Sequence, residues 1–397
     1  MAQLVAVIGA GASIELGAPG TQQITSYLNG QAQNFPAGGN ALVLGAIQAA
    51  LAAHTPSPNF EHVLHTIEAI LSLMRSWRVG TVPRFKVVEA LLTAGPNPAV
   101  TALFDDLVMI DAEKTLFRSI YDLISSASNN AKGSPHWAAF EGFWKQLDQA
   151  FDLNVATFNY DTFIEQALPT LSQGFLPIPP DAEYRFSPKQ FDASIKRLAH
   201  LHGSIQMGYR DMHIDPNRFV LQEDFEDLYF HTTHQAAFST WGNKSTASNQ
   251  AGRESIVGPI ITGMDKSSKV LRAEPYSSYY ASLRASLLQQ PRLLIAGYGF
   301  GDYHANSLLQ RHFDWHGTTR RVVIVDYVPR YEPSSVWAAD QPLKFGALAR
   351  LAGEVAPLSD LSPSHPWVSK DGCVEYYSGG FIDACTNHAQ RILAHLT

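Results

Sequence analysis

The stretch Leu4-Val5-Ala6-Val7-Ile8-Gly9-Ala10-Gly11-Ala12-Ser13 decides the fold. Its first five residues form a continuous apolar run, which is typical of a strand buried on both faces of a parallel sheet. A glycine turn follows at once, and Ile14-Glu15-Leu16 can begin a helix. This order of strand, glycine turn and helix predicts the first unit of an α/β sheet.

The rest of the chain shows where this sheet continues. Helical periodicity fills residues 22–150, with Phe60, Leu64, Ile67 and Leu71 on one face of a helix. We then expect strands at 154–158, 198–201, 255–262, 293–296 and 322–325, helices at 160–171, 276–288 and 381–396, and a mobile polar loop at 231–254. The prediction is a Rossmann-like, doubly wound parallel sheet of about six strands. Residues 1–21 and 151–397 would form this Rossmann-like core, and residues 22–150 a helical insertion subdomain.

Composition excludes several classes of protein. The 397 residues carry a formal net charge of −7 without a block of basic residues, so nucleic acid is not expected to bind directly. We expect a cytoplasmic protein, because the chain has neither a signal-peptide pattern nor an apolar run long enough to cross a membrane. Its two cysteines, Cys373 and Cys385, are too few for a four-thiolate zinc site and are expected to be reduced.

Polar residues and glycines follow the predicted strands, and parallel α/β sheets bind ligands beyond the carboxyl ends of their strands. The candidate residues at these ends are Gly9, Ala10, Gly11, Ser13, Asn159, Asp161, His202, Gly297, Tyr298, Asp302 and Asp326. The first glycine turn can bring backbone amides to a diphosphate, or it can be a plain tight turn. Ile14 stands where the dehydrogenase fingerprint requires glycine, which argues against an ordinary nicotinamide oxidoreductase and leaves dinucleotide binding open.

Three segments together resemble the sirtuins. Gly9-Ala10-Gly11-Ala12-Ser13 with Gly17-Ala18-Pro19, Thr157-Phe158-Asn159-Tyr160-Asp161 and Leu201-His202-Gly203-Ser204 occur in the family order. The chain is most similar to the SIR2-like domains of bacterial antiphage defence proteins, which share an early helical insertion, an aromatic residue after the asparagine and a late Gly-Tyr-x-x-x-Asp loop. Here that loop runs from Gly297-Tyr298 to Asp302, and Asn59-Phe60-Glu61 resembles the start of the insertion.

The resemblance implies that NAD binds at the strand ends and is cleaved at the ribose carbon that holds nicotinamide. Asn159 would hold a ribose hydroxyl or a water, and His202 would take a proton as general base. Asp161 would orient Asn159 or the ribose, or act as a helix N-terminal acid. Asp302 would contact the cofactor or cap the next helix, and Asp326 would accept from the adenosine ribose or lie in a turn. His200 is expected to be structural.

The chain departs from the sirtuin deacylases, since it cannot build their four-cysteine zinc module and lacks a clear acyl-lysine-binding segment. Water is therefore the favoured acceptor, which predicts an NAD glycohydrolase that releases nicotinamide and ADP-ribose or a cyclic ADP-ribose. A deacylase, an ADP-ribosyltransferase and a non-catalytic sensor of NAD or ADP-ribose remain alternatives. Since free NAD hydrolysis would kill the host, we expect a homo-oligomer restrained or activated by a separate protein. The resemblance implies a HerA-like ATPase, an Argonaute-like protein or another phage sensor as that partner.

Overall fold

The computed structural model describes residues 1–32, 39–54, 58–78, 106–178, 183–209, 227–241, 259–261, 270, 273–327 and 364–397. Its main sheet has seven strands in the order β10-β11-β9-β8-β1-β2-β5. Their bounds are β1 Ala2–Ile8, β2 Phe151–Thr157, β5 Arg197–His200, β8 Arg292–Ala296, β9 Arg321–Val325, β10 Trp367–Val368 and β11 Val374–Tyr377. All neighbours pair in parallel except the edge strand β10, which is antiparallel to β11.

The strand order indicates where in the sheet a ligand would bind. Numbered along the chain, the six parallel strands lie in the order 3-2-1-4-5-6, which is that of a Rossmann-like doubly wound sheet. The predicted fold class is therefore confirmed. The order reverses between β1 and β8, and parallel α/β sheets bind ligands beyond the carboxyl ends of the strands at such a switch point. The turn at Gly9 and the loop at Gly297 follow these two strands.

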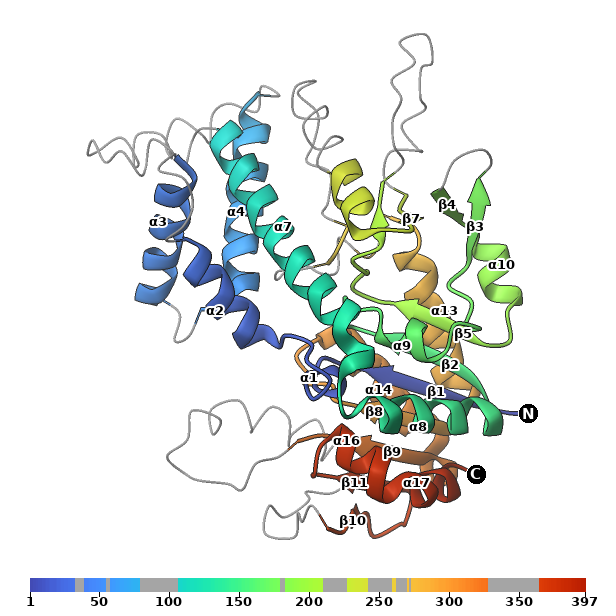
Figure 1. Cartoon of the computed structure of the whole chain (residues 1–397). Coiled ribbons are helices and arrows are strands. Elements are labelled where there is room, and N and C mark those ends of the chain that lie inside the picture. Colours follow the sequence, from blue (N-terminus) through green and yellow to red (C-terminus); the bar gives the residue numbers. More distant parts are fainter. Residues whose placement is uncertain are drawn as a thin grey trace.

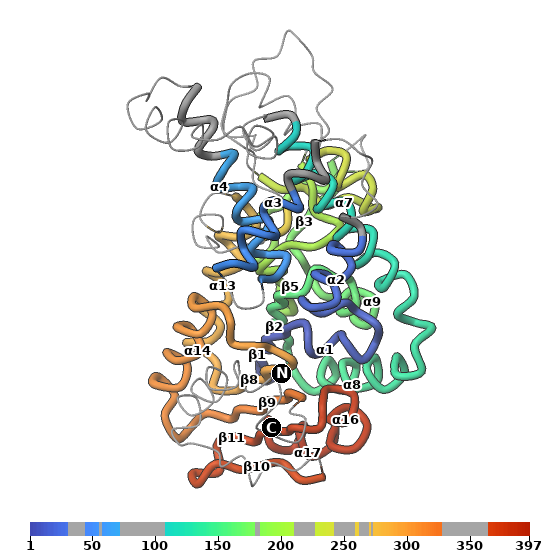
Figure 2. The backbone as a smooth tube through the Cα atoms, turned by 90° about the vertical axis from the view of Figure 1, so that its left-hand side faces the viewer, coloured from blue at the N-terminus to red at the C-terminus, as the bar shows by residue number. Residues whose placement is uncertain are grey.

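Alternating side chains of β1 bury both faces of the sheet. Val5 and Val7 join the core covered by α13 (Tyr276–Gln289) and α14 (Tyr303–His316). Leu4, Ala6 and Ile8 face the opposite core, under α8 (Trp137–Ala150) and α17 (Ala389–Leu396). Figure 2 shows the strands between these two layers of helices. Burial on both faces explains why the strand reads as a continuous apolar run.

The region expected to be helical is helical where the structure describes it. It contains α2 (Thr21–Ala32), α3 (Gly39–His54), α4 (Phe60–Arg78) and α7 (Asp106–Asn130), which gather on one side of the sheet (Figure 1). Leu28, Leu44, Ile67 and Phe117 are buried between them. Residues 79–105 lie outside the described ranges. The last helix of this region, α8, packs on the sheet. Its side chains Phe140, Phe143 and Trp144 contact Phe381, which lies in a helix near the C-terminus. The division at residue 150 stays a prediction.

Several expected elements differ from the structure. A second, antiparallel sheet in the order β3-β4-β7-β6 was not expected; its strands are β3 Phe175–Ile178, β4 Glu183–Phe186, β6 Met207–Gly208 and β7 Tyr229–His231. The helix expected at 160–171 is only α9 (Phe163–Ala167). Of the strand expected at 255–262, the described residues 259–261 belong to no strand. Of the loop expected at 231–254, residues 234–241 are helical, and 242–254 lie outside the described residues.

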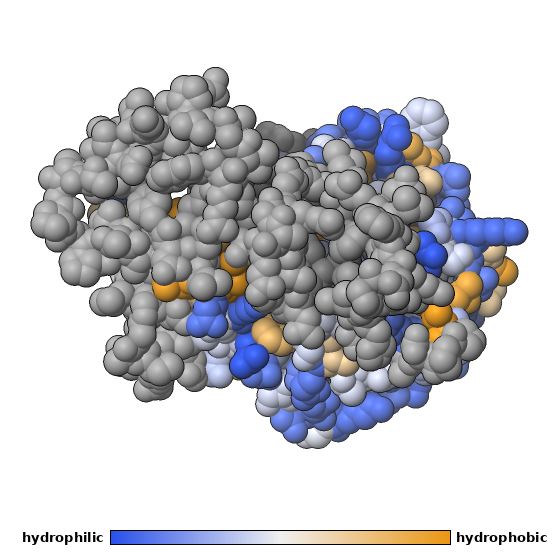
Figure 3. All heavy atoms as spheres, turned by 90° about the horizontal axis from the view of Figure 1, so that it is seen from above, coloured by the Kyte–Doolittle hydropathy of each residue, from blue (hydrophilic) through white to orange (hydrophobic). Residues whose placement is uncertain are grey.

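Short elements complete the fold. They are α1 Gly11–Ile14, the turn of 3-10 helix Ala131–Gly133, α10 Pro188–Ala193, the turn of 3-10 helix Gly317–Thr319, α16 Phe381–Asp383 and the π-helical segment Ala384–His388. Across the described ranges, no helix combines the length and apolar character that a bilayer crossing requires. Seen from above, the coloured part of the surface is largely hydrophilic with small apolar areas (Figure 3).

Candidate active site

The two glycine loops at the switch point pack directly against each other. The Gly9 amide donates to Ala296 O and the Gly11 amide to Gly297 O, both at 2.9 Å. A Cβ on Gly9 would lie 2.6 Å from Gly297 O, and one on Gly11 would lie 2.8 Å from Gly297 Cα. Gly297 itself has a φ of +59°, a conformation that favours glycine. Close packing of the loops thus accounts for these three glycines, and two of the amides expected to face a diphosphate already have protein partners.

Gly297→Ala should therefore destabilise the protein strongly. The new Cβ would collide with the amide nitrogen of Ala12, and the left-handed backbone conformation adds strain. We expect a loss of about 2–4 kcal/mol in the free energy of unfolding, measured by chemical denaturation. Gly299→Ala is the matched control, because a Cβ there meets nothing within 4 Å. Equal stabilities of the two variants would contradict this packing.

A pocket opens where the two loops, the end of β2 and the insertion meet. Its cavity volume is about 280 Å³ and it is open to solvent, so it lies near the lower end of the range for small-ligand sites. The described residues that line it are Gly9, Ala10, Ala18, Pro19, Thr21, Ile24, Phe60, Glu61, Ile124, Phe158, Asn159, Tyr160, Asp161, His202, Tyr298, Gly299, Gly301 and Asp302. The structure thus brings seven expected residues to one pocket. They are Gly9, Ala10, Asn159, Asp161, His202, Tyr298 and Asp302.

The amide of Asn159 is fixed in orientation and has one unpaired oxygen. Its Nδ2 donates to Gly9 O at 3.2 Å and to Ser13 Oγ at 2.9 Å. The Gly9 carbonyl can only accept, so this contact fixes which side of the amide is nitrogen. Asn159 Oδ1 is buried and has no protein partner. Since buried polar atoms in proteins are nearly always paired, this oxygen is suited to accept from a ligand hydroxyl or a water.

Ser13 and Asp161 support that amide from behind. Ser13 is buried and does not line the pocket. Its hydroxyl accepts a hydrogen bond from Asn159 Nδ2 and also hydrogen-bonds the Asp161 side chain. Asp161 Oδ1 also accepts from the amide of Phe163 at 3.1 Å, at the start of α9. Burial raises the pKa of Asp161 to about 6, while the hydrogen bonds from Phe163 and Ser13 oppose this rise. Asp161 thus acts as a helix N-terminal acid and as part of the support for Asn159.

The raised pKa of Asp161 predicts a stability that depends on pH. A carboxyl whose pKa rises on folding, here from 3.8 to about 6, binds more protons in the folded state. Its contribution to the free energy of unfolding is therefore largest below about pH 4 and falls by about 2–3 kcal/mol as the pH rises through 6. Asp161→Asn removes this component. We expect the variant to gain that amount relative to the wild type between about pH 4 and pH 7, and a pH-independent difference would argue against the raised pKa.

His200 is a structural residue, as expected. It is fully buried, and its Nε2 lies 2.8 Å from Glu165 Oε1. Burial alone would lower the pKa of His200, but the charge and hydrogen bond of Glu165 outweigh it, so that this pKa is raised. The ring also contacts the backbone carbonyl of Asn159 at 3.4 Å. This ion pair therefore lies beneath the pocket and steadies the segment that carries Asn159.

The His202 side chain is held by Asp302 and Phe158, which come from two other segments of the chain. Its Nε2 lies 3.0 Å from Asp302 Oδ2, and both side chains are buried. The ring of Phe158 meets the imidazole edge-on with 4.8 Å between centroids, and Phe158 in turn stacks on Tyr298 at 4.8 Å. Asp302 was expected to contact the cofactor or to cap a helix. It caps α14, and its side chain also pairs with His202.

Four expected residues do not line the pocket. They are Gly11, Ser13, Gly297 and Asp326. Asp326 lies at the end of β9, where its Oδ1 accepts from the Tyr327 amide and its backbone joins β11 and Gly380. Its contact with the adenosine ribose stays a prediction. The backbone of Pro259 and the hydroxyl of Tyr276 occupy the space where a Cβ on Gly203 would lie.

The helical insertion also contributes residues to the pocket wall, and none of them was among the candidate site residues. Ile24 comes from α2, Phe60 and Glu61 begin α4, and Ile124 belongs to α7. The resemblance of Asn59-Phe60-Glu61 to the start of an insertion was the available signal, but only the fold shows that this helix end reaches the strand ends. The pocket is therefore closed on one side by the insertion.

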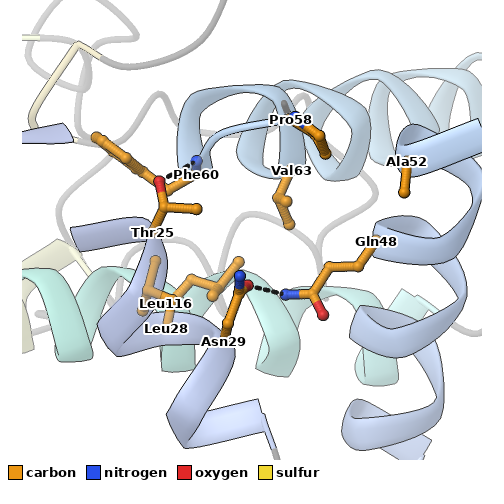
Figure 4. Close-up of a pocket in the computed structure, with 9 residues that line it drawn as sticks. All are labelled: Thr25, Leu28, Asn29, Gln48, Ala52, Pro58, Phe60, Val63 and Leu116. Atoms are coloured by element: carbon orange, nitrogen blue, oxygen red, sulfur yellow. Dashed lines mark hydrogen bonds between the residues drawn. The ribbon is translucent and has the colours of Figure 1, made fainter. Parts of the chain in front are cut away.

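A second cavity lies inside the insertion and shares one wall with the pocket. Figure 4 shows its lining from α2, α3, α7 and the start of α4, with Phe60 common to both cavities. The Phe60 amide donates to Thr25 Oγ1 at 3.1 Å, and Gln48 Nε2 donates to Asn29 Oδ1 at 2.7 Å. The first contact ties the first turn of α4 to α2 and thereby fixes the position of Phe60 at the larger pocket, and the second ties α3 to α2.

Fold and site together define a Rossmann-like α/β protein with a ligand pocket at its switch point. Residues 153–341 match the family model of the SIR2-like domain. This segment includes Asn159, Asp161, His202, Asp302 and Asp326, whereas the first glycine turn precedes it. No curated protein matches the chain. The matched segment is therefore similar to SIR2-like domains, which are related to the sirtuins and use NAD.

Proposed function

We propose that the chain is an NAD glycohydrolase, which cleaves the bond between nicotinamide and ribose. One observation carries the proposal above all others. Asn159 Oδ1, a fixed and unpaired acceptor, shares a pocket with a histidine that is oriented by a carboxylate. An acceptor for a ribose hydroxyl or a water and a general base are what hydrolysis of a ribosyl bond requires.

The reaction balances with these residues alone. The electron pair of the ribose–nicotinamide bond leaves with the nicotinamide nitrogen, which changes from a cation to a neutral ring and needs no general acid. The oxygen of a water forms the new bond to the ribose carbon. His202 takes one proton from this water and later releases it to solvent. The products are nicotinamide, ADP-ribose and one proton.

The charge of the pocket favours this transition state. The described lining residues include the carboxyl groups of Glu61, Asp161 and Asp302 and neither lysine nor arginine. Cleavage moves positive charge from the nicotinamide ring onto the ribose, and fixed negative charge nearby stabilises such an oxocarbenium-like centre.

Incubation of the purified chain with NAD tests the proposal and separates the alternatives. We expect nicotinamide together with ADP-ribose or a cyclic ADP-ribose. Release of nicotinamide only in the presence of an acyl-lysine peptide would indicate a deacylase, and a modified protein acceptor would indicate an ADP-ribosyltransferase. Tight binding of intact NAD would indicate a sensor.

We further propose that this activity serves antiphage defence by depleting NAD in an infected cell, and that assembly into a homo-oligomer or a separate partner protein activates it. The support is the combination of sirtuin-like motifs without a four-cysteine module and the toxicity of unrestrained NAD loss. Tyr303 and Trp315 on α14 are 85% and 71% exposed, so this helix offers aromatic side chains to an assembly.

A further inference from the structure

The loop that follows β8 makes its most specific contact with the residue proposed as the general base. Asp302 Oδ2 lies 3.0 Å from His202 Nε2, although the two residues are 100 positions apart in the sequence. The side chains of His202 and Asp302 are 7% and 6% exposed, so solvent screens their interaction little. A carboxylate accepts only from an N–H, so the imidazole proton lies on Nε2 and the lone pair of the neutral ring on Nδ1.

The other oxygen of Asp302 is anchored independently. Asp302 is the N-cap of α14, and its Oδ1 accepts from the amides of His304 and Ala305 at 3.0 and 3.2 Å. Its backbone carbonyl accepts from the hydroxyl of Tyr298, the residue that stacks on Phe158. The first turn of a rigid helix thus holds the carboxylate in place, with one oxygen used by the helix and the other by His202.

We propose that Asp302 is a positioning residue: it selects the tautomer of His202 in which Nδ1 accepts the proton, and it stabilises the imidazolium that forms. This role rests on the proposed glycohydrolase and replaces the cofactor contact expected from the sequence. In the proposed step the water proton passes to Nδ1, while the Nε2 proton stays in its hydrogen bond to Asp302. One carboxylate oxygen of Asp302 anchors the side chain to α14 and the other accepts from His202, which explains why an aspartate ends this loop.

Two substitutions separate the helix cap from the pairing. Asp302→Ser keeps an N-cap oxygen but has no second oxygen for His202. Asp302→Asn also keeps the cap, yet it turns an N–H₂ group toward Nε2, which drives the imidazole proton onto Nδ1. We therefore expect kcat to fall by roughly 10²–10⁴-fold in Asp302→Asn and by roughly 10–10²-fold in Asp302→Ser. KM and the Kd for NAD should stay within about threefold of the wild type.

Ser187→Ala provides the matched control. Ser187 caps α10 by accepting from the Gln190 amide, and it lies outside the pocket. Removing it costs about 1 kcal/mol of stability through a lost cap alone, and we expect unchanged turnover. If both Asp302 variants also kept normal kcat, Asp302 would be only a cap. If their loss appeared as a raised KM and Kd with normal kcat, Asp302 would contact NAD directly. Either result overturns the proposal.

Nitrogen-15 NMR of histidine-labelled protein reads the tautomer without any turnover, with the His202 signals assigned from their absence in His202→Gln. We expect the proton on Nε2 in the wild type and on Nδ1 in Asp302→Asn. The same tautomer in both proteins would refute the positioning role. An inactive wild type with the expected tautomers would instead count against the glycohydrolase and leave the pairing intact, so the two failures are distinguishable.

Discussion

His202→Ala should abolish NAD cleavage while NAD still binds. The imidazole matters mainly in the transition state, where it accepts the proton of the attacking water, and losing a general base costs roughly 10²–10⁴-fold in kcat. We expect most of the affinity to come from the adenosine half of NAD, which takes no part in breaking the ribose–nicotinamide bond. The measurements are nicotinamide release and the Kd for NAD by calorimetry.

His202→Gln separates this catalytic role from a structural one. Alanine leaves Asp302 Oδ2 without the donor that it has at 3.0 Å, so His202→Ala should also lose some stability. Glutamine can still donate to Asp302 but cannot act as a base near neutral pH. We expect the glutamine variant to keep a wild-type melting temperature and to be as inactive as the alanine variant. A glutamine variant with near-normal turnover would remove His202 from the mechanism.

Asn159→Ala should be comparably damaging, with a loss of roughly 10²–10⁴-fold in kcat/KM. The substitution removes the acceptor Oδ1 and the two donor contacts that fix it, to Gly9 O and Ser13 Oγ. The ribose and the water would then be misplaced relative to His202. Kinetics on the purified variant give the value, and full activity would contradict the assignment.

Two further variants sharpen this prediction. Ser13→Ala removes only one of the two acceptors that hold the Asn159 amide, so its loss should be clearly smaller than that of Asn159→Ala. The combined variant Asn159→Ala with His202→Gln should lose little more than either single variant, because both residues serve one step. Additive losses would mean that the two side chains act in separate steps.

The buried strands explain how much of the fold could be predicted. β1, β8 and β9 contain apolar runs of four or five residues covered on both faces, a pattern that local sequence expresses well. β11 was missed because its four residues Val-Glu-Tyr-Tyr include the charged Glu375, whose burial depends on Arg391 and on the hydroxyl of Tyr377. The strands of the second sheet have two to four residues, too few to show a period.

Some residues of the candidate site could be predicted from local sequence, whereas contacts between distant segments could not. Asn159 and His202 could be predicted because each belongs to a short motif at a strand end, and the structure places both in one pocket. The pairing of Asp302 with His202 could not, since a helix cap and a histidine partner look alike in sequence and the contact spans 100 residues. The glycines were expected to face a ligand, but tertiary packing between two loops is what requires them.

The most direct test of the central claim is the product analysis of NAD incubated with the purified chain over a range of protein concentrations, beside His202→Gln. We predict that nicotinamide appears in equal amounts with ADP-ribose or its cyclic form, and that the rate per chain rises as the protein assembles. The variant should release neither product. NAD recovered intact at saturating binding, or equal release by the wild type and the variant, would contradict it.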